Sequence, residues 1–138
     1  KKLKKLEKKT AKKVVRKGVR EGQKLTLKEA KSNSSSMIGG DMGNQISSAL
    51  KVKATRKQKK GSYSLQTCID PNQADEFIDI SKDGNRNFIP NAINYGHRKK
   101  GGGTVPAIPF MTNAADSTEK AKVKKMFKII KKGIEQVK

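Results

Sequence analysis

The segment 97–104 gathers residue types that could bind a phosphate or exchange a proton. It contains, in order, His97, Arg98, Lys99, Lys100, Gly101, Gly102, Gly103 and Thr104. A phosphate-binding loop needs glycines followed by Lys and Ser or Thr, between a strand and a helix, so that amides and lysine converge on the phosphate. Here the lysines precede the glycines and Pro106 follows them. We therefore interpret the segment as a flexible loop and expect it to become ordered at a subunit interface.

Other groups suited to catalysis or metal binding are few. His97 is the only histidine, and no Cys or carboxylate stands at zinc-ligand spacing from it. The serines form no nucleophile-elbow pattern, and many of them fall in the run 32–36. Cys68, the only cysteine, lies in an apolar run and is expected to be a small core residue. We predict that the chain is not an enzyme and that it has no catalytic residue, no metal site and no cofactor.

A short acidic patch stands apart from these groups. Asp75, Glu76 and Asp79 fall within one five-residue stretch. Three carboxylates so close together could hold a cation weakly. The favoured interpretation is an exposed acidic face, which could meet a basic face on a neighbouring subunit.

The charge of the chain is large and unevenly distributed. The formal net charge is +21. Residues 1–31 hold 14 Lys or Arg against 3 acids, and residues 119–138 hold 8 against 2. Such ends suit acidic partners such as nucleic acid, an anionic membrane or acidic protein surfaces, or they are solvated lysine faces. No nucleic-acid-binding motif is present and aromatics are only 4%, so any DNA binding would be electrostatic and non-specific.

Length and composition predict one domain, 1–138, with a small core. Hydrophobic residues make up 33% of the 138 residues, which is little for a domain that must bury its own core. We therefore expect extended elements and support from neighbouring subunits. No apolar run approaches the roughly 20 residues of a membrane span, so no membrane partner is expected. The single cysteine and the lack of an apolar leader fit synthesis inside a cell.

The first half of the chain predicts a basic helix, a loop and a hairpin. Segment 1–31 has helical periodicity from 3 to 30, and Gly18 and Gly22 share one helix face that a partner backbone could approach closely. Segment 32–45 is rich in Ser, Asn and Gly and is expected to be a mobile loop. Segment 46–80 contains two alternating apolar runs joined by a polar turn, which indicates a hairpin and sheet.

The second half predicts two helices separated by a loop. A short helix is expected at 87–95, a Gly- and Pro-rich loop at 96–111, and a C-terminal helix at 114–137 with Asp116 and Glu119 at capping-box spacing. The last helix has the strongest apolar stripe, which we expect to form the main core against the hairpin: Val123, Met126, Phe127, Ile130 and Ile134. The predicted fold is α+β, with long N-terminal and C-terminal helices packed on a small antiparallel sheet and a short extra helix.

The basic N-terminal helix is a second candidate for an assembly interface. Its charge should make it repel itself, and its apolar stripe is too long to be covered by so small a domain. We expect it to meet either an acidic surface on adjacent proteins or DNA, and we favour the protein. The side chains assigned to this interface are Lys4, Leu6, Lys8, Lys12, Val14 and Arg16.

The segment from Phe88 to Ala114 resembles a family of tailed-phage structural proteins, the tail components named after the tenth gene product of a lambdoid coliphage. The matching features are a Gly43-Asn44-Gln45-Ile46 turn before a strand, a helix ending in Tyr95-Gly96-His97, and the pair Pro109-Phe110. The order of elements matches over nearly the whole chain. Two positions depart from the family pattern: many members have an acid where this chain has Asn94, and a Leu where it has Gln45.

This resemblance implies a structural subunit of a virion. It would form part of the neck or head–tail connector, or complete the tail, by assembling into a homo-oligomeric ring in the host cytoplasm. Its partners would be other neck, connector, tail-terminator or tail-tube proteins, with possible non-specific contact to genomic DNA. The alternative is a basic protein that binds nucleic acid non-specifically, which only the net charge supports.

Overall fold

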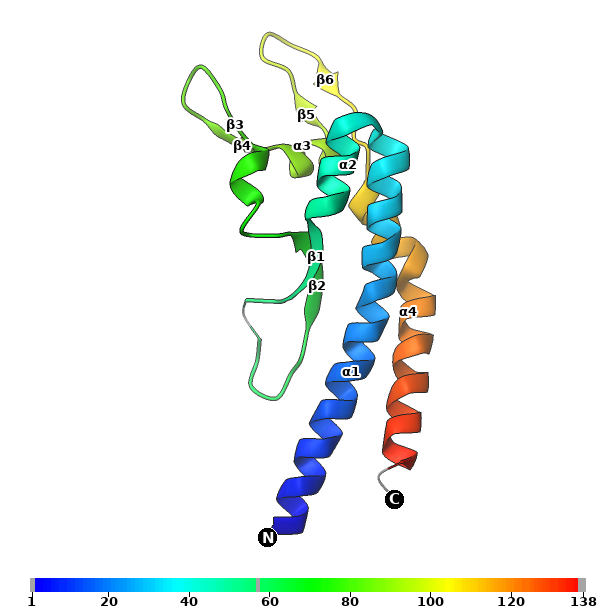
Figure 1. Cartoon of the computed structure of the whole chain (residues 1–138). Coiled ribbons are helices and arrows are strands. Elements are labelled where there is room, and N and C mark those ends of the chain that lie inside the picture. The colour runs from blue at the N-terminus through cyan, green and yellow to red at the C-terminus, as the bar shows by residue number, and fades with distance from the viewer. Residues whose placement is uncertain (1, 57, 137–138) are drawn as a thin grey trace.

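The chain folds into a long two-helix stem with a small head at one end. The computed structural model describes residues 2–56 and 58–136, and the side chains from residue 7 onward. Helix α1 (Lys2–Asn33) and helix α4 (Phe110–Glu135) run antiparallel along the stem, so that α1 begins and α4 ends far from the head (Figure 1). The predicted α+β class is confirmed, including both long helices and the short one.

The predicted loop at 32–45 is wrong, because this segment is helical. The helix α1 passes into a π-helical turn at Ser34–Ile38, and α2 (Gly40–Ala49) follows at once. Gly39 and Gly40 reverse the chain with φ of 72° and 59°. Ser34 is fully buried and its hydroxyl donates to the Lys31 carbonyl. Burial of this corner in the head therefore outweighs the weak helix propensity of its Ser, Asn and Gly residues.

The first hairpin is shorter than expected and packs on the stem. Strands β1 (Leu50–Ala54) and β2 (Leu65–Ile69) pair antiparallel, with Val52 opposite Thr67. Residues 46–49, predicted as strand, complete α2 instead. The hairpin is held to α1 by a hydrogen bond from Gln23 Nε2 to Thr67 Oγ1 of 3.0 Å, and by the guanidinium of Arg16, 5.4 Å from the centre of the Tyr63 ring.

A 3-10 turn, two small hairpins and a short helix complete the head beside α2. A 3-10 turn (Ala74–Phe77) leads into the hairpin β3 (Ile78–Ile80) and β4 (Arg86–Phe88), which is followed by α3 (Ile89–Tyr95). The segment expected to be loop at 96–111 contains a small hairpin, β5 (His97–Arg98) and β6 (Thr104–Val105). Gly96 ends α3 with φ 72°, and a Cβ there would lie 2.6 Å from the Val105 carbonyl oxygen, so only glycine fits. The sheet is thus three separate two-stranded hairpins.

Helix α4 begins at Phe110, four residues before the predicted start at 114. Asp116 and Glu119 therefore lie inside the helix and do not cap it. The helix packs mainly along α1, whereas we expected it to pack on the hairpin. No helix of the described residues is long and apolar enough to cross a membrane.

The core lies in the head, where α1, α2, the hairpin and the start of α4 meet. Its fully or nearly buried members are Ala30, Ile46, Ala49, Leu50, Phe77, Phe110 and Ala114. The expected core stripe of α4 is wrong. Val123, Phe127 and Ile134 are exposed, and Met126 and Ile130 are only half-buried. The reason is geometric: the stem has one helix on one side of α4, which cannot cover so wide an apolar face.

The stem is held together by close contact at glycines. A Cβ at Gly18 would lie 2.7 Å from Ile130 Cγ1, and one at Gly22 would lie 2.6 Å from Met126 Cγ. Farther along the stem, Val14 packs directly over Gly133 of α4. The prediction that a partner backbone approaches the Gly18–Gly22 face is confirmed, and the partner is α4 of the same chain.

Candidate assembly surface

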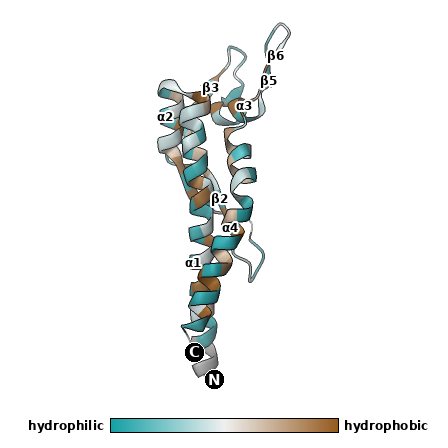
Figure 2. Cartoon of the chain, turned by 90° about the vertical axis from the view of Figure 1, so that its right-hand side faces the viewer, coloured by the Kyte–Doolittle hydropathy of each residue, from teal (hydrophilic) through white to brown (hydrophobic). Residues whose placement is uncertain are grey.

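One face of α4 carries large apolar side chains that the rest of the described chain leaves partly or largely exposed. The exposed fractions are 41% for Val123, 70% for Phe127 and 50% for Ile134. Ile130 links them and is half-buried against Gly18. Figure 2 shows hydrophobic and hydrophilic segments alternating along the stem where α1 and α4 lie together. We call Val123, Phe127, Ile130 and Ile134 the α4 stripe.

The spacing of the α4 stripe is that of a helix-pairing seam. Its members follow one another at steps of four, three and four residues. This is the heptad pattern by which two helices pack side chains into each other's grooves. The stripe covers twelve residues, from Val123 to Ile134, and its eleven residue steps span about 16 Å at 1.5 Å per residue. It is therefore long enough to seat about three turns of a partner helix.

Lysines border the α4 stripe on its solvent side. Lys124 and Lys131 lie three residues before and four residues after Phe127, so they neighbour it on the helix surface. Lys120 stands three residues before Val123. All three are exposed. Within the part of the chain that the structure describes, no ion pair involves a residue of α4.

The interface residues assigned to the N-terminal helix divide into three groups. Val14 is half-buried over Gly133, and the guanidinium of Arg16 lies over the Tyr63 ring although the residue stays exposed, so both have contacts within the chain. Lys8 and Lys12 are exposed. The side chains of Lys4 and Leu6 lie outside those that the structure describes. Sequence periodicity found the stripe of α1 but could not show that α4 covers part of it.

The basic segment 97–103 forms strand β5 and the turn that leads into β6; it is exposed, and this hairpin projects from the head (Figure 1). Lys99 closes the turn by accepting an N–H from Gly102 and donating its own to Gly103. Lys100 Nζ lies 2.6 Å from Asp83 in the β3–β4 turn, which ties the two hairpins together. The expected basic, exposed segment is therefore present, though it is a short hairpin in place of an irregular loop.

The side chains that could take part in catalysis or metal binding do not lie together. Cys68 is half-buried, and burial raises the pKa of its thiol, which keeps it a poor nucleophile at neutral pH. The acids Asp75, Glu76 and Asp79 are exposed, and Asp75 lies 4.0 Å from Arg86. Among residues 2–56 and 58–136, no group of three or more His, Cys, Asp or Glu is placed to hold a metal ion.

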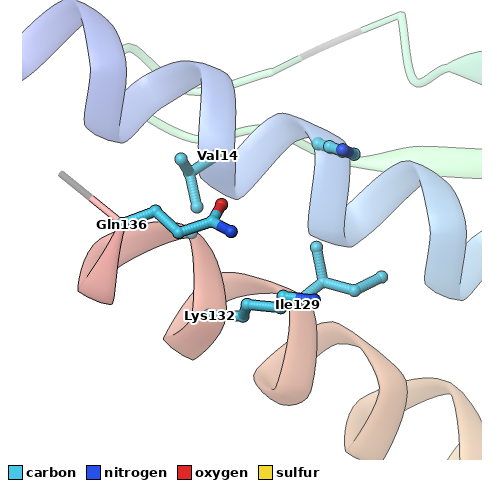
Figure 3. A pocket seen from close by; sticks show the side chains of 6 residues that line it. Val14, Ile129, Lys132 and Gln136 are labelled. Carbon is cyan, nitrogen blue, oxygen red and sulfur yellow. The ribbon is translucent and has the colours of Figure 1, made fainter.

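One hollow lies between the middle of α1 and the last turns of α4, with a volume of about 510 Å³. Figure 3 shows Val14, Ile129, Lys132 and Gln136 between the two ribbons. The other lining residues are Lys17 and Gly133. This lining offers an apolar floor, two ammonium groups and one amide. It contains no pair of groups that could act as acid and base.

Asn94 has a structural role that the sequence did not reveal. Its side chain is buried, and Oδ1 accepts the backbone N–H groups of Met111 and Thr112 at 3.0 and 3.3 Å. Its Nδ2 donates to Thr112 Oγ1 at 3.2 Å. These N–H groups belong to the first turn of α4, which has no cap from its own chain segment. Asn94 thus caps α4 from α3, a contact that local sequence signals cannot show.

Replacing Asn94 tests this capping role. Asn94→Ala should lower the free energy of unfolding by about 1–2 kcal/mol, because it removes the side-chain cap from two part-buried N–H groups in the first turn of α4. Asn94→Asp should retain most of the stability, since a carboxylate accepts the same two bonds and is favoured at a helix N-terminus. Urea unfolding followed by circular dichroism measures both. Equal losses for Ala and Asp would contradict the assignment.

Phe127 should contribute little to the stability of the isolated chain. Because its side chain is 70% exposed, Phe127→Ala should change the free energy of unfolding by less than about 1 kcal/mol, as at other surface sites. Thermal and urea unfolding of the purified variant measure this change. A loss of about 3 kcal/mol or more, typical of a buried Phe, would show that the α4 stripe is covered within the chain.

Comparison of the chain with protein-family models, with curated proteins and with solved structures finds no match.

Proposed function

We propose that this chain is a structural subunit of a tailed-phage particle. It forms part of the neck or head–tail connector, or completes the tail, by assembling into a ring and joining other particle proteins. The single observation that carries the assembly role is the uncovered α4 stripe, with Phe127 70% exposed on a projecting stem. The phage setting rests on the resemblance of segment 88–114 to the tail-component family.

The distribution of buried residues supports an assembly role. The core is confined to the head, and each element contributes only one or two residues to it. The stem extends away from it with its own apolar face open to solvent. A large apolar side chain exposed on a regular seam is costly to leave in water, and such faces mark sites of protein association.

Non-specific binding of nucleic acid is the second candidate. The observation that favours it is the set of exposed lysines and arginines on both stem helices. Phosphate contacts would engage these charges but would leave the α4 stripe in water, because a phosphate backbone offers no apolar surface. An acidic protein surface could pair with the basic side chains and also bury the α4 stripe. Assembly with a protein therefore explains both features, whereas DNA binding explains only the charges.

Two measurements separate these functions. Size-exclusion chromatography with light scattering, on the chain alone and mixed with neck, connector and tail proteins, should show a complex much larger than the 15.2 kDa subunit. A gel shift with duplex DNA should show only weak binding that falls steeply with salt. A monomer in every mixture, together with tight DNA binding at physiological salt, would favour the second candidate.

Removing the turn of β5–β6 tests the role of segment 97–103. Deleting Gly101, Gly102 and Gly103 should remove the two hydrogen bonds that close this turn and leave the rest of the fold unchanged, because the three glycines are exposed in a turn that projects from the head. The deletion should block particle completion, because the charged hairpin could no longer reach a neighbour. Circular dichroism measures the fold, and plaque-forming titre measures completion. Normal titre from the deletion would contradict the interface role.

A further inference from the structure

We infer that the α4 stripe is the docking site for an acidic amphipathic helix of a different protein. The inference deepens the proposed function, because it names the chemistry of one assembly partner. It rests on three observations: the exposed apolar seam, the lysines along its outer border, and the glycine packing that fixes its inner border. Each observation narrows the class of partner.

The spacing of the α4 stripe indicates that its partner is a helix. Its four members recur at steps of four, three and four residues, as at the a and d positions of a heptad. An α-helix with apolar residues at the same spacing can interdigitate with them over about three turns. The same pattern places Lys124 and Lys131 at the flanking e position, which faces the border of a partner helix. A partner with Glu or Asp at its own border would pair with both lysines.

A second copy of this seam does not fit. In an antiparallel pair of α4 stripes, Lys124 and Lys131 would face the same lysines of the other copy, and like charges repel there. In a parallel pair they would face Met126 and Gly133, which are covered by α1 through Gly22 and Val14. Among the described helices none combines an acidic border with an uncovered apolar face. The partner helix therefore comes from another chain.

An anionic membrane surface is a weaker match. A helix that lies in a membrane interface presents a wide apolar face with lysines on both sides. Here one side of the α4 stripe is occupied by α1, and only three large side chains are exposed. The stripe is thus narrow and has lysines along one border, which suits a single helix better than a lipid layer.

A designed peptide provides the probe. It has about 21 residues, three heptads, with Leu at a and d and Glu at e and g. A control peptide of the same composition has its Leu residues scattered, and a second control has Lys in place of Glu. Binding to the full chain is measured by fluorescence anisotropy of labelled peptide. Vesicles of phosphatidylglycerol and phosphatidylcholine, and light scattering of the chain alone, test the membrane and the second copy.

We expect the acidic heptad peptide to bind, and the scattered and lysine peptides to bind at least about tenfold more weakly. Phe127→Ser should weaken binding about tenfold or more. Lys124→Glu with Lys131→Glu should abolish binding of the acidic peptide and create binding of the lysine peptide. The matched control, Lys128→Glu with Lys132→Glu, changes the same net charge at exposed positions off the seam and should leave the preference for the acidic peptide.

Four outcomes overturn the inference. In the first, the acidic heptad peptide does not bind, and in the second, the scattered peptide binds equally well. In the third, the chain binds vesicles but not the peptide, and Phe127→Ser removes the vesicle binding. In the fourth, the chain self-associates and Phe127→Ser removes this self-association. The probe contains no phage protein, so the peptide result stands apart from the proposed function. Peptide binding without incorporation into particles would overturn the phage role alone.

Discussion

Phe110→Ala should be the most damaging single substitution in this chain, lowering the free energy of unfolding by about 3–5 kcal/mol. Phe110 is the first residue of α4 and is completely buried in the head. Its carbonyl accepts a hydrogen bond from Asn33 Nδ2 at 3.1 Å, so the residue also ties α4 to the end of α1. Removing the ring leaves a cavity in a core that has few large side chains, and small domains have little stability to lose.

Urea unfolding followed by circular dichroism measures this loss, and Phe127→Ala serves as the matched control. Both variants remove the same ring from the same helix, one from the core and one from the exposed face. We expect the losses in free energy of unfolding of the two variants to differ by about 2 kcal/mol or more. Similar losses for the two variants would show that the core is not confined to the head.

The second large effect is expected at the glycines of the stem. Gly18→Leu with Gly22→Leu should lower the free energy of unfolding by about 2–4 kcal/mol, although Leu has the better helix propensity by about 1 kcal/mol at each site. A Cβ at Gly18 would lie 3.2 Å from the Met126 carbonyl oxygen, and one at Gly22 would lie 3.1 Å from that of Lys122. Because these are backbone atoms, a larger side chain must move α4 away from α1.

Hydrogen exchange read by mass spectrometry locates this effect. Exchange should accelerate along the half of α4 beyond Lys122 and remain slow in the head, since Phe110 and Ala114 hold the start of the helix. Ala121→Leu, at an exposed position of α4, is the control and should leave exchange unchanged. Unchanged protection in the glycine variant would mean that the two helices are not closely packed.

Periodicity predicted the elements well where one face alone had to be buried. Both long helices, the first hairpin and the α+β class follow from the spacing of apolar residues, and the α3 end at Gly96 follows from its turn chemistry. Gly18 and Gly22 were correctly identified as a close-approach face. These features depend on neighbours along the chain, which a sequence displays directly.

Features set by distant contacts were missed. The segment 32–45 is helical because the head buries Ser34 and because Gly43 lets α2 approach the Ser34 backbone closely. The segment Gly43-Asn44-Gln45-Ile46, which we expected to be a turn before a strand, therefore lies inside α2. The capping of α4 by Asn94 spans 17 residues of sequence and has no local signal.

The sequence predicts correctly that α4 is amphipathic, but it predicts incorrectly that the apolar face of α4 forms the main core. Apolar periodicity shows that a face needs a partner, but it cannot show whether the partner is in the same chain. Here α1 covers the side of α4 that includes Met126 and Gly133, and the side with Phe127 stays in water. That division is what turns an expected core stripe into a candidate assembly surface.

Particle completion by a Phe127→Ser variant shows whether the chain assembles through the α4 stripe. Phage carrying this substitution would be produced in the host, and plaque-forming titre would be compared with the amount of variant chain that sediments with particles. We expect a folded chain that fails to join particles and a titre lower by orders of magnitude. Normal incorporation and normal titre with Phe127→Ser would contradict the claim that the chain works by assembling through the α4 stripe.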